Sequence, residues 1–129
     1  MRLLPLLAAL LPLAACTPPV ANAPADTVPA ATVIGPAVSC LPTTQISNTE
    51  VRDDRTIDFR MTGGRTYRNT LPYPCPELGF EKRFAYTIST SQLCSVDVIT
   101  VLHSGGIPRG ASCGLGEFVP VELAPRDRP

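Results

Sequence analysis

The sequence predicts an all-β domain, a small antiparallel sheet curled into a barrel or sandwich and held by two disulfides. Short stretches of alternating or β-branched residues recur along the chain, and turns rich in glycine and proline separate them. Four of the five cysteines, an even number, fall among these stretches. No convincing amphipathic helical pattern occurs after residue 16.

The chain begins with a segment that is typical of an export signal. Arg2 precedes an apolar run over residues 3–13, which is too short for a permanent membrane span and contains two prolines. The residues Leu13-Ala14-Ala15-Cys16 resemble a bacterial lipoprotein box. This resemblance implies that residues 1–15 are removed as a signal peptide and that a diacylglyceryl group is attached to Cys16.

The same resemblance implies a location. Thr17, rather than an aspartate, follows Cys16, which resembles the pattern that is sorted to the outer membrane in enteric bacteria. We therefore expect a lipoprotein of the cell envelope that faces the periplasm, with the outer membrane favoured. The two or three acyl chains of a lipoprotein would anchor it to the membrane permanently.

Residues 16–39 are expected to form the lipidated cysteine and an extended tether. Between Thr17 and Ser39 the chain has five prolines and a single charge, Asp26. Such proline density leaves no helical or strand period. At ~3 Å per residue, this tether could hold a domain up to roughly 60 to 70 Å from the lipid surface.

The folded domain is expected over residues 40–123, followed by a frayed polar tail over 124–129. Removal of residues 1–15 leaves 114 residues, enough for one small domain. The full chain carries 11 basic and 11 acidic residues. This balance gives no reason to expect a nucleic acid partner.

Five or six short strands are expected in this domain. The first is an edge strand over 44–51, which a polar turn follows. In the next strand, Ile57, Phe59 and Met61 alternate with polar residues, the pattern of a half-buried strand. The other strands are expected over 66–71, over 84–88, over 96–102 at the centre of a sheet and over 117–121 as an edge strand that contains a proline, with a short turn over 76–80.

Gly63-Gly64 predicts a hairpin between the second and third strands. A two-residue loop would set Met61 opposite Thr66, an apolar residue against a polar one. A three-residue loop over 63–65 sets Met61 opposite Tyr67. We favour the longer loop because it places apolar residues against apolar residues.

Five arginines lie within a window of 17 residues: Arg52, Arg55, Arg60, Arg65 and Arg68. The favoured register places Arg60 opposite Arg68 on the outer face, with Asp58 on the diagonal. Like charges directly opposite each other cost stability unless an acid or a bound anion lies between them. We favour a solvated face balanced by acids, and the alternative is an anion-binding face of Arg55, Arg60 and Arg68 for a phosphate of an envelope lipid or polymer.

The four remaining cysteines are Cys40, Cys75, Cys94 and Cys113. Two disulfides are expected in an oxidising compartment, and each would stabilise the fold by roughly 2 to 4 kcal/mol. Sequence alone permits three pairings, and we favour Cys75 with Cys94 and Cys40 with Cys113. Their spacings of 35, 19 and 19 residues argue against a zinc site, whose ligands come in close pairs, so neither a metal nor a cofactor is expected.

His103 is the only histidine, so a catalytic triad would have to include it. Nothing in its spacing from Asp97 or from any serine demands that geometry. Asp53 and Asp54 are expected to cap a turn rather than to act as an acid and base pair. No catalytic residue is therefore predicted and the protein is not expected to be an enzyme, with a hydrolase using His103 as an alternative.

Several segments of the domain together resemble a family of small, uncharacterised proteobacterial envelope proteins with four spaced cysteines. The resemblance spans residues 40–121 and depends on Cys40-Leu41, 51–57, 67–71, Cys75-Pro76, Leu93-Cys94 with Asp97 and Ile99, and 113–118. It implies export and a cysteine-stapled all-β fold, and it implies no activity. We therefore expect a lipid-anchored envelope protein that binds an unidentified envelope protein or ligand, or has a structural part.

Overall fold

The structure, a computed structural model, describes residues 28–105 and 109–125. Its elements are β1 (Ala31–Val33), β2 (Cys40–Pro42), the 3-10 turn η1 (Thr43–Gln45), β3 (Ile46–Val51), β4 (Thr56–Met61), β5 (Thr66–Thr70), α1 (Leu78–Glu81), β6 (Phe84–Tyr86), β7 (Gln92–Cys94), β8 (Val98–Val101), β9 (Ser112–Gly114) and β10 (Phe118–Leu123). The predicted export signal, Cys16 and residues 126–129 lie outside the described residues.

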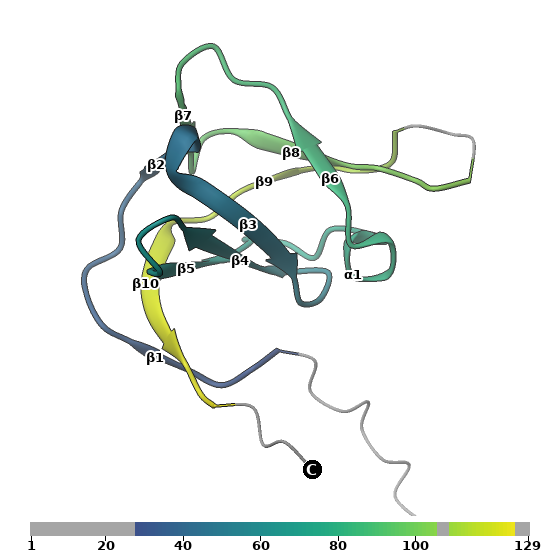
Figure 1. The fold of residues 1–129 in the computed structure, drawn as a ribbon. Coiled ribbons are helices and arrows are strands. Elements are labelled where there is room, and N and C mark those ends of the chain that lie inside the picture. The colour runs from purple at the N-terminus through teal and green to yellow at the C-terminus, as the bar shows by residue number, and fades with distance from the viewer. Residues whose placement is uncertain (1–27, 106–108, 126–129) are drawn as a thin grey trace, which may run out of the picture.

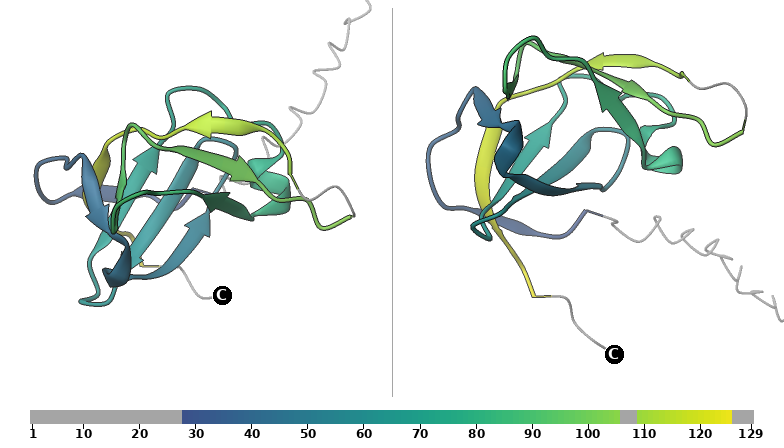
Figure 2. Two further views of the ribbon diagram at one scale, coloured as in Figure 1. Left: turned by 90° about the horizontal axis from the view of Figure 1, so that it is seen from above. Right: turned by 45° about the horizontal axis from the view of Figure 1, so that its top comes forward.

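The strands form antiparallel sheets arranged as a sandwich (Figure 1). One sheet has five strands in the order β1-β10-β5-β4-β3, a second has three in the order β6-β8-β9, and β2 pairs with β7. The three-stranded sheet lies across one face of the larger sheet (Figure 2). The predicted all-β antiparallel class with two disulfides is confirmed as a sandwich, and the described residues form no closed barrel.

The core lies between the two larger sheets. Ile57 and Phe59 of β4 are fully buried, as the alternation predicts, but Thr56 and Asp58 are buried too, so β4 is not the half-buried strand that was expected. The ring of Phe59 packs edge to face against Phe118 of β10, with centroids 5.4 Å apart, and against Phe84 of β6 at 6.3 Å. One aromatic ring from the middle of the larger sheet therefore contacts both layers.

The places of two strands agree with expectation. β3 is an edge strand of the five-stranded sheet, and β8 lies between β6 and β9. The short turn expected over 76–80 overlaps α1, a single helical turn at Leu78–Glu81. The described part of the chain contains more strands than the five or six that the sequence predicts, because several of them are only three residues long.

The predicted register of the β4–β5 hairpin is wrong by two residues. Phe59, not Met61, pairs with Tyr67, and the Met61 N–H donates to the Arg65 carbonyl at 2.8 Å across a loop of residues 62–64. Gly64 has φ 90° and supplies the left-handed residue that ends such a three-residue loop. A shift of two residues keeps every side chain on its original face, so the apolar pattern could not exclude it.

The new register also changes the charge pairing that was expected. Asp58 lies directly opposite Arg68, and Arg60 lies opposite Thr66. The predicted pairing of Arg60 with Arg68 is therefore wrong. Opposite charges face each other in place of like charges, which favours this register energetically.

The folded part of the chain begins before Cys40, so the expected tether over 16–39 is wrong for its last residues. β1 pairs with β10, with Thr32 opposite Glu122, and Val38 forms a bridge with Phe118. The β-branched run over 32–34 favours a strand, but prolines at both sides of it hid this signal.

β10 is not the edge strand that Pro120 suggested, because it lies between β1 and β5. The Pro120 carbonyl accepts a hydrogen bond from the Ile34 N–H at 3.0 Å. The N–H and C=O of one antiparallel residue face the same neighbour, so the N–H that proline lacks would also have faced Ile34. β1 ends at Val33, one residue before Ile34. The hydrogen bond that Pro120 cannot donate is therefore missing only at the end of the ladder between β1 and β10.

The four cysteines form two disulfides as expected, but the favoured pairing is wrong. Cys40 is bonded to Cys94, with Cα atoms 4.0 Å apart, and Cys75 is bonded to Cys113, with Cα atoms 5.9 Å apart. Cys40 and Cys94 are direct partners in the β2–β7 pair. Pairing between strands so far apart in the chain depends on tertiary structure and has no local signal.

A buried asparagine joins β5 to the segment before β10. Asn69 is fully buried, and its amide nitrogen donates to the Gly116 carbonyl at 2.7 Å while its oxygen accepts the Gly116 N–H at 2.9 Å. A side chain at position 116 would collide with the Thr70 carbonyl oxygen, so this close approach requires glycine.

Replacement of Asn69 by alanine is expected to lower the free energy of unfolding by about 2 kcal/mol, because two backbone groups lose their partners in a partly buried place. Urea unfolding followed by circular dichroism measures the change. Asn48→Ala, on the exposed side of β3, is the matched control and should stay within about 0.5 kcal/mol of the wild type. Equal stability of the two variants would contradict the proposed role of the Asn69 amide.

Candidate functional site: a depression beside α1

One end of the domain carries a shallow depression of about 520 Å³ between the β3–β4 turn and α1. It combines three cations with two carboxylates. The lining residues are Arg52, Arg55, Lys82, Asp53, Asp54, Pro74 and Gly79.

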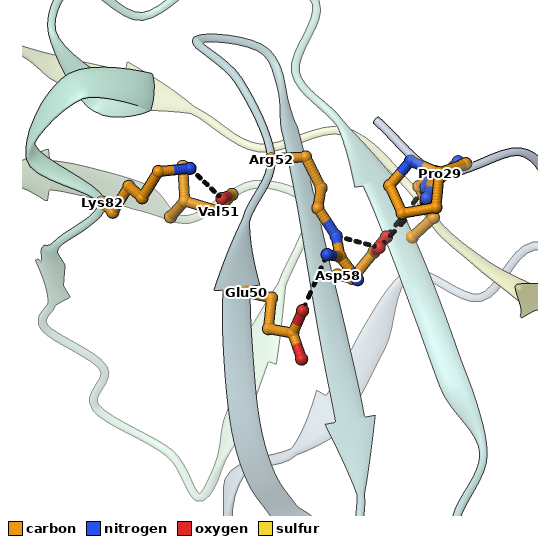
Figure 3. Close-up of polar contacts among 7 residues, drawn as sticks. Pro29, Glu50, Val51, Arg52, Asp58 and Lys82 are labelled. Carbon is orange, nitrogen blue, oxygen red and sulfur yellow. Dashed lines mark hydrogen bonds and ion pairs between the residues drawn. The ribbon is translucent and has the colours of Figure 1, made fainter. Parts of the chain in front are cut away.

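Two of the cations have only neutral partners. Arg55 Nε donates to the Leu71 carbonyl at 2.6 Å, and its Nη2 donates to the Pro72 carbonyl at 3.2 Å. Lys82 Nζ donates to the Val51 carbonyl at 3.2 Å (Figure 3). No carboxylate among the described residues lies within 4.0 Å of either charged group. Both charged groups are thus held by backbone carbonyls and form no direct ion pair with a described carboxylate.

The two aspartates of the depression bind backbone N–H groups. Asp53 Oδ1 accepts the Arg55 N–H at 2.8 Å, and Asp54 Oδ1 accepts the Gly79 N–H at 2.7 Å. The expectation that these residues cap a turn is confirmed for Asp53. Asp54 differs because its partner lies outside its own turn: its bond to Gly79 joins α1 to the β3–β4 turn.

Two exposed aromatic residues adjoin lining residues of the depression in the sequence, and Tyr73 itself lines a neighbouring depression with Cys113 and Gly114. Tyr73 precedes Pro74 and is 79% exposed, and Phe80 follows Gly79 and is 84% exposed. Leu78 on the same helical turn is fully buried. The single turn of α1 therefore packs one side chain into the core and presents the other to solvent.

A buried carboxylate lies between two arginines next to the depression (Figure 3). Asp58 is 3% exposed, and it accepts hydrogen bonds from Arg52 Nε at 2.8 Å and from Arg68 Nε and Nη2 at 2.8 and 3.0 Å. Arg52 also pairs with Glu50 at 2.8 Å, and Arg68 Nη1 donates to the Pro29 carbonyl at 2.9 Å. Burial alone would raise the pKa of Asp58, but the hydrogen bonds from Arg68 and Arg52 outweigh it and hold that pKa below its ordinary value.

The predicted anion-binding face of Arg55, Arg60 and Arg68 is not assembled as a group. Arg68 has a carboxylate partner in Asp58, which the anion-site hypothesis did not allow. Arg60 is exposed and lines a different depression, beside the β4–β5 loop. Of the three, only Arg55 lies in the depression beside α1.

The hydrolase hypothesis needs a hydrogen bond between a serine and the imidazole of His103, and the geometry does not provide one. His103 Nδ1 lies 3.1 Å from Glu81 Oε1, and its Nε2 lies 3.1 Å from Glu77 Oε2. Ser104 Oγ bonds to Glu81 Oε2 at 3.4 Å rather than to the ring. The hydrogen bond with His103 lowers the pKa of Glu81. His103 thus fastens the segment after β8 to α1.

Sequence reasoning singled out Arg55 but missed Lys82, Tyr73 and Phe80. The sequence carries some signal for the aromatics, since Tyr73 lies between two prolines and Phe80 falls outside the alternating run over 84–88. The sequence carries no signal that brings Lys82 and Phe80 near Arg55, because this proximity depends on the hydrogen bond between Asp54 and Gly79.

Comparison with protein-family models, with curated proteins and with solved structures finds no match for this chain. The resemblance to small envelope proteins therefore stays a prediction. Within the ranges 28–105 and 109–125, no helix has the length and apolar character needed to cross a membrane.

Proposed function

We propose that the protein is a lipid-anchored component of the cell envelope, attached to a membrane through Cys16. In this proposal the β domain binds another envelope component or has a structural part, and it has no catalytic role. It faces the periplasm, with the outer membrane favoured over the inner one.

The observation that carries this proposal is the pairing of all four domain cysteines in two disulfides. Disulfides form and persist in oxidising compartments outside the cytoplasm, and small domains use them to supplement a limited core. The lipoprotein box that Cys16 completes would deliver the chain to such a compartment. Export to an oxidising compartment would account for the two disulfides, and the two disulfides in turn support the proposal of export.

We expect the mature protein to begin at Cys16, to carry a diacylglyceryl group there and to partition into the detergent phase. Intact mass spectrometry and detergent phase separation measure these properties. In a Cys16→Ser variant the lipid mass should disappear, because serine offers no thiol for the attachment.

A Cys40→Ser/Cys94→Ser variant is the matched control, since it removes two other cysteines and should keep the lipid. Recovery of the wild type from the cytosol with residues 1–15 intact and four free thiols would contradict the proposal.

A further inference from the structure

We propose that the depression beside α1 docks on the anionic surface of the bilayer that carries the lipid anchor. Phe80 and Tyr73 enter the interfacial layer, and Arg55 and Lys82 face the lipid phosphates. This inference rests on the proposed anchoring at Cys16 and adds to it an orientation and a second contact with the membrane.

The side chains of this end suit a membrane interface. Phe80 and Tyr73 are almost fully exposed, and aromatic rings are favoured at the level of lipid headgroups. Among the described residues, Arg55 and Lys82 have only carbonyl partners, so their charges can pair with phosphates. An anionic leaflet attracts such basic groups with about 1 kcal/mol per residue.

Three contacts fix the position of α1 beside the depression. The Cys75–Cys113 disulfide holds the segment before α1, the Asp54 bond to Gly79 holds its middle, and His103 holds Glu81 at its end. Glu77 and Lys82, which flank the turn, have φ values of 68° and 54°, in the left-handed region that non-glycine residues seldom adopt. A surface held this firmly loses little conformational entropy when it binds.

A relay of side-chain contacts links the start of the described chain to this depression. The Pro29 carbonyl binds Arg68, Arg68 binds Asp58, and Asp58 binds Arg52, which lines the depression (Figure 3).

The distance from the anchor is limited by covalent geometry. Val28 is 12 residues beyond Cys16, which spans about 40 Å at most when fully extended. A domain of this size has a radius of gyration of about 13 Å, so its breadth is comparable to that reach. The anchor therefore keeps the domain within reach of the bilayer, and its length allows the end with the depression to face the lipid.

The chain contains no tryptophan, so a single introduced indole reports its own surroundings. The experiment uses the mature lipidated protein carrying Phe80→Trp, or Tyr73→Trp as a second reporter. The matched control is Val96→Trp, since Val96 is 87% exposed and follows β7, a strand that lies on the side of the molecule away from α1 (Figure 1). Each protein is placed in vesicles of phosphatidylethanolamine and phosphatidylglycerol that contain brominated lipid.

We expect brominated lipid to quench most of the emission of Phe80→Trp and Tyr73→Trp and little of that of Val96→Trp. Adding Arg55→Gln and Lys82→Gln to the Phe80→Trp protein should reduce the quenching, as should replacement of phosphatidylglycerol by phosphatidylcholine. Adding Arg60→Gln, which removes an exposed arginine outside the depression, should leave it unchanged. Thermal unfolding checks that each variant is folded.

Flotation of the same vesicles separates the two proposals. If the protein floats with the vesicles but the three reporters are quenched equally, docking is overturned and anchoring stands. If the protein does not float and Cys16 carries no lipid, both proposals fall. A blue-shifted emission of Phe80→Trp that brominated lipid leaves unquenched would point to a protein partner or a second copy, and it would overturn docking on lipid.

Discussion

Replacement of Cys75 and Cys113 by alanine is expected to lower the free energy of unfolding by about 4 kcal/mol, the largest effect of any change considered. The bridge joins residues 38 apart in the sequence, and closing a loop of that length in the unfolded chain corresponds to about 4 kcal/mol. Cys75 is fully buried, so its loss also removes packing in the core. Urea unfolding without reductant measures the change.

The same variant also tests the pairing. With Cys40 bonded to Cys94, the double alanine protein should have no free thiol in its domain. With the pairing favoured from sequence, it would leave two free thiols. Thiol titration of the denatured protein distinguishes these outcomes, and a disulfide-linked peptide that joins Cys75 to Cys94 in the wild type would contradict the structure.

The second large effect is expected for Asp58→Asn. The variant leaves Arg52 and Arg68, whose side chains are only 10% and 15% exposed, without the carboxylate between them. Breaking a buried ion pair by removing one partner costs about 3 to 5 kcal/mol, and we expect about 3 because both arginines reach solvent in part. Glu122→Gln, at an exposed carboxylate of β10, should change stability by less than about 0.5 kcal/mol.

The pH dependence of unfolding provides an independent measurement of the same carboxylate. Because the folded state lowers the pKa of Asp58, the resulting stabilisation is complete above the unfolded-state pKa of about 3.9. It is lost as the pH falls from there through the lower pKa of the folded state. The wild type should therefore lose more stability than Asp58→Asn on acidification, and parallel curves would show that Asp58 does not titrate as its contacts imply.

The elements that could be predicted from sequence are those whose signal is local. The inward face of β4 follows from a period of two, which needs no knowledge of the partner strand. β8 was predicted from its β-branched residues. The β1 strand was missed because the prolines around it were taken as evidence against any strand, although the three residues of β1 lie between them.

Contacts between distant parts of the chain could not be predicted in this way. The Cys40–Cys94 bridge depends on the pairing of β2 with β7, and those strands are separated by most of the domain. The hairpin register was wrong because only the apolar pattern was used to choose it. The charges held the missing information, since Asp58 opposite Arg68 is more favourable than Arg60 opposite Arg68.

The candidate site shows the same division between local and distant signals. Arg55 stood out because arginines cluster in that part of the sequence. Lys82 and Phe80 did not, because they reach the depression only when α1 is fastened to the β3–β4 turn. Sequence reasoning could therefore identify part of the charge but not the surface to which it belongs.

The pairing of β1 with β10 places the two ends of the described chain side by side. Ala31 lies opposite Leu123, and the Ala124 N–H donates to the Ala30 carbonyl at 2.8 Å. A short glycine-rich peptide could therefore join the two ends, and the chain could be opened at another surface loop without breaking a strand. This domain is thus a natural candidate for circular permutation.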